Sequence, residues 1–281
     1  QQNAEASETV RTKLSTYLSD GKRILTITDY DGVDVIEIHT LDGSAAPIKL
    51  EGLDLGRPKR LLPNPTKETV ALTNHRHELL LVELKDKKVV KVSSSRHGQF
   101  PGCAWSSDGK WLAYSQPLSP SVSAIHIWNS ESGKSNQVTD PILADREPVF
   151  DPEGKYLYFV GERIFNPVYD SLHFDLGFPK GTKPYLITLK ADEPNPFLPS
   201  PRPLQDAPPA KENGDDKKGK DQKEDKEKKS DEPKPVEIDF DGIQQRVVAF
   251  PIPEGRYTNI AAIPGKMLYL SFPVEGALEQ N

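Results

Sequence analysis

One phrase of apolar and polar positions recurs along this 281-residue chain. Residues 103–115 (CAWSSDGKWLAYS) and 148–160 (PVFDPEGKYLYFV) both give an apolar stretch with an aromatic residue, a short polar turn ending in Gly-Lys, and an apolar run. The same template fits residues 61–74 and 17–29, and its turn positions are spaced by 46, 42 and 45 residues: Asp20, Thr66, Asp108 and Glu153. Self-similarity at about 40–45 residues is the period of a four-stranded propeller blade.

The chemistry of the repeated runs distinguishes strands from helices. The runs are short and rich in β-branched and aromatic residues, as in residues 24–27 (ILTI) and 156–160 (YLYFV), and Asp-Gly or Glu-Gly turns bound them. This pattern is typical of a strand, a turn and a second strand, and it lacks the 3.6-residue period of a helix. We therefore predict an all-β fold, a β-propeller of four-stranded antiparallel blades.

The phrase also divides the chain. We expect an N-terminal extension over residues 1–14, blades 1 to 4 over 15–190, a disordered charged insertion within blade 4 over 191–235, and the end of blade 4 with a partial fifth blade over 236–281. In this division the third strand of blade 4 lies near 184–189 and its fourth near 245–250. Because closed propellers have about four to eight complete blades, roughly five units with an unfinished last one predict an incomplete segment of a larger propeller.

Composition supports the insertion and narrows the partners. Residues 211–235 hold nine lysines and nine acidic residues, and no aromatic residue lies between Phe197 and Phe240, so this stretch cannot bury enough apolar surface to fold. Its balanced charge and the net charge of −6 argue against a nucleic-acid partner. No run of 18 apolar residues is present, which predicts no membrane span.

Cysteine usage and the N-terminal residues bear on the compartment. The lone Cys103 excludes an internal disulfide framework and is compatible with a cytoplasmic location. The polar start QQNAEASETV lacks the apolar segment of a signal peptide. A chain whose upstream signal had been removed would lack it too, so a periplasmic or secreted location stays open.

Each of three candidate functional sites is better explained by a structural role. The segment 29–34 (DYDGVD) crowds three carboxylates but misses the EF-hand spacing, and a hairpin turn accounts for it. His75 and His77 with Glu78 resemble part of a zinc site, yet no third and fourth ligands are evident, and a polar loop is the simpler interpretation. Cys103 is expected as a small buried residue. With no G-x-S-x-G and no glycine-rich phosphate loop, we assign no catalytic, metal or cofactor residue and expect no cofactor.

An aromatic segment at residues 163–181 interrupts the fourth blade between its second and third strands. It has few charges and four aromatic residues: Phe165, Tyr169, Phe174 and Phe178. Loops at this point emerge on one end face of a propeller. Two interpretations remain open, a loop that packs on another domain or lines a channel mouth, and a loop that caps its own blade.

The residues around the insertion resemble a known family. FNPVYDSLHFDLGFPKGTKPYLITL (165–189), the charged insertion, and the phrase I-D-x-D-G-I-x-x-R-V-V-x-x-P from Ile238 to Pro251 resemble the propeller region of tricorn-type serine peptidases of the S41 peptidase family. The resemblance covers the chain from about residue 15 to its end. The phrase SSDGKWLAYS alone is less specific, because TolB-like and prolyl-oligopeptidase propellers share it.

The resemblance implies part of a large peptidase that degrades oligopeptides. In that family the propellers act as filters and passages for peptides, the catalytic Ser, His and Glu belong to a C-terminal domain, and the enzymes form homo-oligomers. None of those catalytic motifs matches a position here, so whether this chain itself is an enzyme stays undecided. We expect a non-catalytic propeller with a gating, channelling or scaffolding role. A free-standing TolB-like interaction propeller and the propeller of a prolyl-oligopeptidase-like enzyme are the alternatives.

Overall fold

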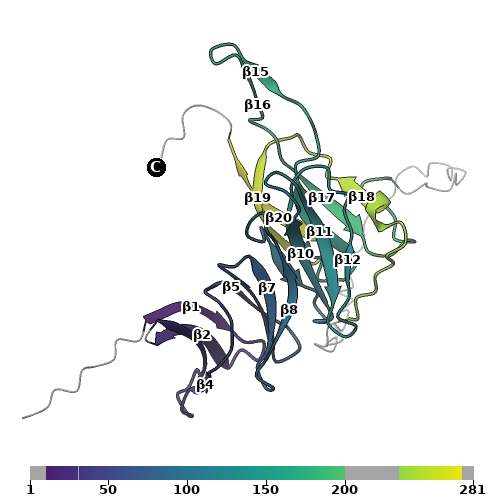
Figure 1. Cartoon of the computed structure of the whole chain (residues 1–281). Coiled ribbons are helices and arrows are strands. Elements are labelled where there is room, and N and C mark those ends of the chain that lie inside the picture. Colours follow the sequence, from purple (N-terminus) through teal and green to yellow (C-terminus); the bar gives the residue numbers. More distant parts are fainter. Residues whose placement is uncertain (1–10, 31, 200–233, 274–281) are drawn as a thin grey trace, which may run out of the picture.

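The computed structural model describes residues 11–30, 32–199 and 234–273, and in that part of the chain the fold is all-β (Figure 1). Four antiparallel sheets of four strands follow one another along the sequence. Blade 1 has the strand order β1 (Arg11–Tyr17), β2 (Arg23–Tyr30), β3 (Val33–Thr40), β4 (Ile48–Leu50). Blade 2 has β5 (Pro58–Pro63), β6 (Thr69–Asn74), β7 (Glu78–Glu83), β8 (Lys88–Ser94). The predicted β-propeller architecture is confirmed.

Blades 3 and 4 repeat this order, and the fourth contains the long excursions. Blade 3 has β9 (Cys103–Trp105), β10 (Trp111–Pro117), β11 (Ser123–Asn129), β12 (Ser135–Gln137). Blade 4 has β13 (Asp145–Phe150), β14 (Tyr156–Gly161), β17 (Lys183–Thr188), β18 (Val247–Ala249). The hairpin β15 (Val168–Asp170) and β16 (Asp175–Gly177) separates β14 from β17, and a 3₁₀ turn, η1 (Ile243–Arg246), precedes β18. A two-stranded sheet of β19 (Arg256–Ile263) and β20 (Lys266–Phe272) follows.

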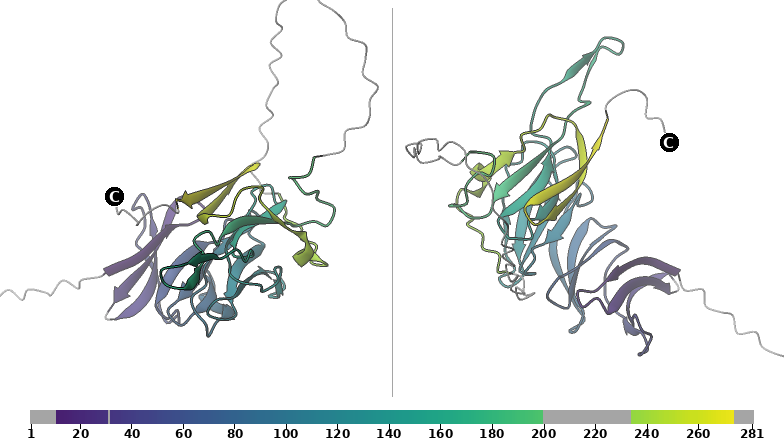
Figure 2. Two further views of the ribbon diagram at one scale, coloured as in Figure 1. Left: turned by 90° about the horizontal axis from the view of Figure 1, so that it is seen from above. Right: turned by 180° about the vertical axis from the view of Figure 1, so that it is seen from behind.

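The blades stand side by side in an arc (Figures 1 and 2). The first strands of successive units contact one another, β1 with β5, β5 with β9, β9 with β13, and β13 with β19. The first strand of each unit therefore lies on the inner side of the arc, where a propeller has its central channel. Among the residues that the structure describes, no helix has the length and hydrophobicity needed to span a membrane.

The apolar core lies between the blades. One buried cluster joins blade 1 to blade 2 through residues such as Leu25 and Leu80, and a second joins blade 2 to blade 3 through Ala71 and Trp128. A third joins blades 3 and 4, and all seven residues of β10 are buried. Because neighbouring blades cover both faces of a middle strand, these strands carry continuous apolar runs, which is the pattern that the sequence repeats.

Equivalent positions of the sequence repeat occupy equivalent positions in blades 3 and 4. Trp105 pairs with Leu112 in blade 3, and Phe150 pairs with Leu157 in blade 4, each in the register that the offset of 45 residues predicts. Both aromatic side chains are buried. The indole N–H of Trp105 also donates a hydrogen bond of 3.1 Å to the Leu62 carbonyl in the preceding blade.

The repeated turns contact each other across blade boundaries. The Thr66 hydroxyl donates to the Asp108 carbonyl at 2.9 Å. The carboxylate of Asp108 in turn accepts a 2.7 Å hydrogen bond from the backbone N–H of Val236, and the indole of Trp111 donates to the Val236 carbonyl at 2.8 Å. At Gly109 the backbone has a φ of 68° and a Cβ would lie 2.3 Å from the Asn64 side chain, so only glycine fits.

Two expected boundaries differ from the structure. Residues 11–14, expected in the N-terminal extension, belong to β1, which pairs with β2 although its own side chains are mostly exposed. Residues 191–199, expected in the disordered insertion, are packed on blade 4, where the ring of Phe197 lies 4.8 Å from that of Phe250. Beyond them, residues 200–233 lie outside the described part of the chain.

Both ends of this insertion are fixed at one place. Lys190 forms an ion pair with Glu237, and the backbone N–H of Ala191 donates to the Asp239 carboxylate at 2.9 Å. The residues that leave blade 4 and the residues that return to it therefore lie side by side.

Candidate functional site

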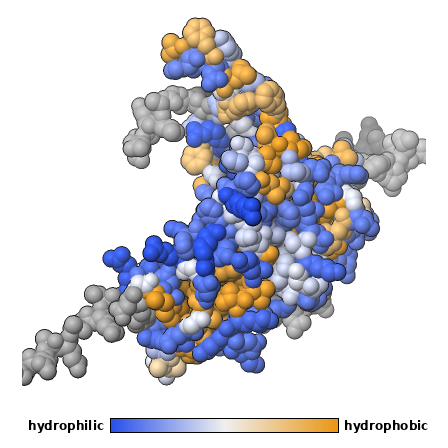
Figure 3. All heavy atoms as spheres, in the orientation of Figure 1, coloured by the Kyte–Doolittle hydropathy of each residue, from blue (hydrophilic) through white to orange (hydrophobic). Residues whose placement is uncertain are grey.

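The aromatic segment 163–181 forms a hairpin that projects from blade 4 (Figure 1). Its aromatic residues stay largely in solvent, with Phe165 74% and Phe174 79% exposed. The space-filling view shows apolar residues on the projecting hairpin at the top of the molecule (Figure 3). The tip of the hairpin therefore does not cap its own blade.

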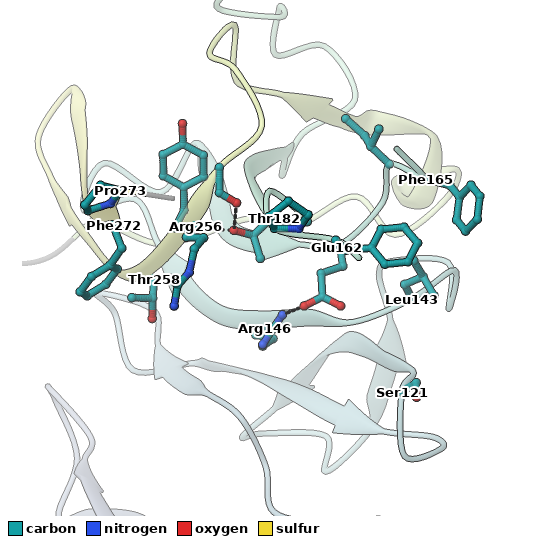
Figure 4. A pocket seen from close by; sticks show the side chains of 16 residues that line it. Ser121, Leu143, Arg146, Glu162, Phe165, Thr182, Arg256, Thr258, Phe272 and Pro273 are labelled. Atoms are coloured by element: carbon teal, nitrogen blue, oxygen red, sulfur yellow. Dashed lines mark hydrogen bonds and ion pairs between the residues drawn. The ribbon is translucent and has the colours of Figure 1, made fainter. Parts of the chain in front are cut away.

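A pocket of about 840 Å³ lies at the base of this hairpin (Figure 4). It is formed where several elements reach the same end face: the turn between β10 and β11, the start of β13, the end of β14, both ends of the hairpin segment, the start of β19 and the end of β20. Its volume is within the range of about 300–1,000 Å³ found for small-ligand sites. The first strands β13 and β19 begin at this end face and lie on the inner side of the arc, so the pocket adjoins that inner side.

Two arginines and one glutamate supply the charge in this pocket. Arg146 at the start of β13 forms an ion pair with Glu162, which follows β14. The Nε of Arg146 is buried and has no hydrogen-bond partner. Arg256, the first residue of β19, is exposed, and its side chain reaches into the polar half of the pocket together with Thr258 (Figure 4).

The opposite wall of the pocket is apolar. The rings of Phe165 and Phe178 meet at 5.2 Å between centroids and at an angle of 57°. Leu143 lies on the same side as Phe165, whereas Phe272 lies on the other side, next to Thr258 and Arg256 (Figure 4). Both sides of the pocket thus carry apolar residues, and the Arg146–Glu162 ion pair lies between them.

Next to the pocket a buried ion pair between Arg163 and Asp145 fixes the start of β13. Arg163 binds the Asp145 carboxylate through Nε at 2.9 Å and through a second nitrogen at 2.5 Å. Burial raises the pKa of Asp145 above its ordinary value, and the Arg163 guanidinium opposes that effect. The hydroxyls of Ser115 and Ser123 donate to the Asp145 carbonyl, which ties blade 3 to this strand.

A second carboxylate attaches the last sheet to blade 4. Glu147 has a φ of 53° in a bulge of β13. Its carboxylate accepts hydrogen bonds from the Thr258 hydroxyl at 2.8 Å and from the backbone N–H of Asn259 at 2.6 Å. The start of β19, which carries Arg256 and Thr258 into the pocket, is therefore held by a charged anchor.

In the acidic turn 29–34 two carboxylates form ion pairs with a lysine. The Lys13 ammonium lies 2.9 Å from the Asp29 carboxylate and 2.5 Å from that of Asp34. The Lys13 contact lowers the pKa of Asp29. Asp31, the third acidic residue of this motif, lies outside the described residues.

The His75, His77 and Glu78 cluster has local structural partners. His75 accepts a 2.9 Å hydrogen bond from the Arg57 backbone N–H, and Glu78 forms ion pairs with Arg76 and Lys91. Over residues 11–30, 32–199 and 234–273 no group of three or more His, Cys, Asp or Glu is arranged to hold a metal ion.

Cys103 belongs to the apolar contacts between blades 2 and 3, and burial raises the pKa of its thiol. A raised pKa keeps the thiol protonated and poorly nucleophilic.

Sequence reasoning found the aromatic segment 163–181 but missed the pocket at its base. Arg146, Glu162 and Arg256 are separated by long stretches of chain, and each reads as an ordinary charge at the end of a strand. The available signal was the repeat itself, because positions at the start of a first strand and at the end of a second strand share one end face of a propeller.

Comparisons with known proteins place the chain in a family. Residues 2–281 match the family described as "Tricorn protease second beta propeller domain". The chain is 32% identical over 278 residues to "Tricorn protease homolog 1" of Streptomyces coelicolor, with 97% of the chain and 25% of that protein covered. It is 30% identical over 252 residues to "Tricorn protease homolog" of Saccharolobus solfataricus, with 88% of the chain and 20% of that protein covered.

A solved structure agrees on the fold. The "Crystal structure of the tricorn protease" aligns over 95% of this chain and 24% of its own length, with a TM-score of 0.74 and 21% sequence identity. The chain thus spans about a fifth to a quarter of the length of these relatives. The resemblance seen around residues 165–189 and 238–251 is confirmed, and the chain belongs to the family of tricorn protease second β-propeller domains.

Proposed function

We propose that this chain is a non-catalytic propeller through which a tricorn-like serine peptidase admits oligopeptides to a catalytic part outside the chain. The observation that carries the proposal is the arc of first strands, combined with membership of the tricorn propeller family. First strands that adjoin one another surround a passage in a propeller, and peptides are the molecules that a peptidase must admit. Assembly of the parent protein into a homo-oligomer and a cytoplasmic location are part of this proposal.

A scaffolding role is supported by a separate observation. The hairpin β15–β16 exposes Tyr169, Leu172 and Phe174 to solvent. Two-stranded hairpins are marginally stable in water by themselves, and aromatic residues are enriched in the buried centres of interfaces. We propose that the hairpin packs on another part of the peptidase.

Blocking the passage tests the admission of peptides. Lys59 is exposed on β5, a strand on the inner side of the arc, whereas Lys85 is exposed in the turn between β7 and β8 of the same blade. In the full-length peptidase with Cys103→Ala, Lys59→Cys is coupled to a maleimide polyethylene glycol. We expect kcat/KM for oligopeptides to fall severalfold, because the polymer occupies the passage.

The matched control is Lys85→Cys with the same polymer, which is expected to leave kcat/KM unchanged. If the label at position 59 has no more effect than the label at position 85, the passage proposal is wrong.

A further inference from the structure

The tip of the hairpin β15–β16, residues 170–175, is an ordered turn that presents apolar side chains to solvent. One oxygen of the Asp170 carboxylate accepts hydrogen bonds from the backbone N–H groups of Leu172 at 2.8 Å and His173 at 3.3 Å. Its other oxygen lies 2.7 Å from Nδ1 of His173. Leu172 is 78% exposed and Phe174 is 79% exposed, and Phe174 has a φ of 55°, which is uncommon for an aromatic residue. The turn therefore holds two large apolar side chains outward.

The pocket at the base of the same hairpin is apolar on both sides, and its charged groups balance one another. Arg146 forms an ion pair with Glu162. The second arginine, Arg256, lies two residues from Thr258, whose hydroxyl donates to the Glu147 carboxylate. Two cations thus face two carboxylates. The complement of such a pocket is an apolar side chain rather than an ion.

The hairpin tip and the pocket lie at opposite ends of one segment. Phe165 and Phe178, which flank the hairpin, line the pocket, and the hairpin extends away from it (Figure 1). A tip at the far end of the hairpin does not fill the pocket at its own base. In a second copy related by a two-fold axis, the same tip meets this pocket and the same pocket receives this tip, because a two-fold contact is self-complementary.

The hairpin also leaves room for a copy beside it. Strands β15 and β16 pair only with each other among the described residues, so both outer edges of this small sheet are open. Two hairpins in antiparallel orientation can therefore lie side by side, with each tip next to the base of the other.

The exposed aromatic area matches what a dimer needs. Phe165, Tyr169, Phe174 and Phe178 are 74%, 58%, 79% and 47% exposed. With about 200 Å² for each aromatic side chain, this is about 500 Å² on one copy and about 1,000 Å² on two. Leu172 adds to this area. Specific interfaces bury about 1,200–2,000 Å² in total, so this segment supplies most of the area of a small dimer interface.

We infer that two copies of this chain associate through their hairpins, each inserting its hairpin tip into the pocket of the other. Leu172 and Phe174 then lie between the two apolar sides of the partner's pocket, whose volume of about 840 Å³ accommodates both side chains. This inference rests on the proposed function, in which the hairpin packs on another part of the peptidase and the parent protein is a homo-oligomer, and it names the hairpin's partner as a second copy.

Sedimentation velocity of the purified 281-residue chain tests the association. We expect a reversible dimer with a Kd of about 1–100 μM, the range of a small interface. Phe174→Asp is expected to weaken the dimer by about tenfold to a hundredfold, because it places a charge in an apolar pocket. The matched control is Leu41→Asp, at a position 50% exposed in the turn after β3, and it is expected to leave the Kd unchanged.

Cross-linking between copies locates the contact. In the Cys103→Ala background, chains with Leu172→Cys are mixed with differently tagged chains that carry Ser121→Cys, at an exposed position that lines the pocket. Mild oxidation is expected to join the two kinds of chain by a disulfide. Ser44→Cys, at an exposed position in blade 1, replaces Ser121→Cys in the control and is expected to give severalfold less of the mixed product.

Three results overturn the inference. These are a chain that sediments as a monomer at every concentration, equal effects of Phe174→Asp and Leu41→Asp on the Kd, and equal cross-linking of position 172 to positions 121 and 44.

The proposed function and this inference fail separately. If the 281-residue chain is a monomer while Phe174→Asp lowers the thermal midpoint of the full-length peptidase more than Leu41→Asp does, the hairpin packs on another part of the same polypeptide and the second copy is refuted. If the dimer forms as expected while labelling at position 59 leaves turnover unchanged, the passage is refuted and the dimer stands.

Discussion

Asp108 and Trp111 hold the returning chain at Val236 from two sides, and their removal gives a quantitative test of the fold. The Asp108 carboxylate accepts the Val236 N–H at 2.7 Å, and the Trp111 indole donates to the Val236 carbonyl at 2.8 Å. Val236 is buried in the cluster between blades 3 and 4. Without either partner, one buried polar group of the backbone loses its hydrogen bond.

The expected cost follows from this geometry. Asp108→Ala leaves the Val236 N–H unpaired, at about 1–3 kcal/mol, and also removes the turn contacts to Ser106 and Lys110, at about 0.5–1.5 kcal/mol each before relaxation. Trp111→Phe keeps much of the ring contact with Phe240 but leaves the Val236 carbonyl unpaired, again at about 1–3 kcal/mol. We expect about 2–4 kcal/mol for the first variant and about 1–3 kcal/mol for the second.

The double variant Asp108→Ala with Trp111→Phe shows whether the two hydrogen bonds to Val236 depend on each other or act separately. Once one hydrogen bond is lost, the segment at Val236 is free to move towards water, so the second substitution costs less than it does alone. We expect a coupling of about 0.5–3 kcal/mol from urea unfolding of the four proteins, and faster hydrogen exchange of the amides at 234–240.

Asp42→Ala is the control, because Asp42 is exposed and accepts a hydrogen bond from Ser44 within its own turn. It is expected to change stability by about 0.5 kcal/mol or less. Additive single effects, or an Asp108→Ala cost no larger than that of Asp42→Ala, would refute the reasoning.

Four further predictions address the core, pH, the insertion and activity. Phe150→Ala should cost about 3–5 kcal/mol in urea unfolding, and a variant as stable as the parent would contradict the repeat register. Burial lowers the pKa of His126, so the unfolded chain binds protons more readily and stability falls as pH drops through the unfolded value of about 6.5; His126→Phe should lose less stability than the parent over that range. Replacing residues 200–233 by a short Gly-Ser linker should leave the thermal midpoint nearly unchanged, whereas replacing 191–235 should lower it because Phe197 is lost. The purified chain should hydrolyse no oligopeptide and take no label from a serine-directed covalent reagent, and labelling of a single serine with turnover would overturn the assignment of catalysis to a part outside the chain.

Strands bounded by tight turns were predictable because their signals are local. The apolar runs at residues 24–27 and 156–160 lie in strands as the sequence predicts, since each run and the turn residues next to it lie in one short window. The strand β1 was missed because RTKLSTY is mostly polar, and its structure comes from pairing with β2.

Contacts over long separations were not predictable from local patterns. The packing of Phe197 on Phe250 depends on a partner more than fifty residues away, and composition alone placed Phe197 in the charged insertion. The pocket was missed for the same reason, because Arg146 and Arg256 line one pocket only when β13 of blade 4 and β19 lie side by side. The aromatic segment was recognised by its composition, and its hairpin became visible only in the structure.

The ion pair between Lys190 and Glu237 holds the two ends of the connecting segment together, so the stability of the blade depends little on the length of that segment. With both ends held together, each doubling of the length of a flexible loop would cost only about 0.6 kcal/mol of closure free energy. The connection between these fixed ends can therefore be lengthened, shortened or exchanged during evolution while β17 and β18 remain paired. The position between Lys190 and Glu237 also offers a site at which a complete folded domain, such as a fluorescent reporter, can be inserted at the rim of the propeller.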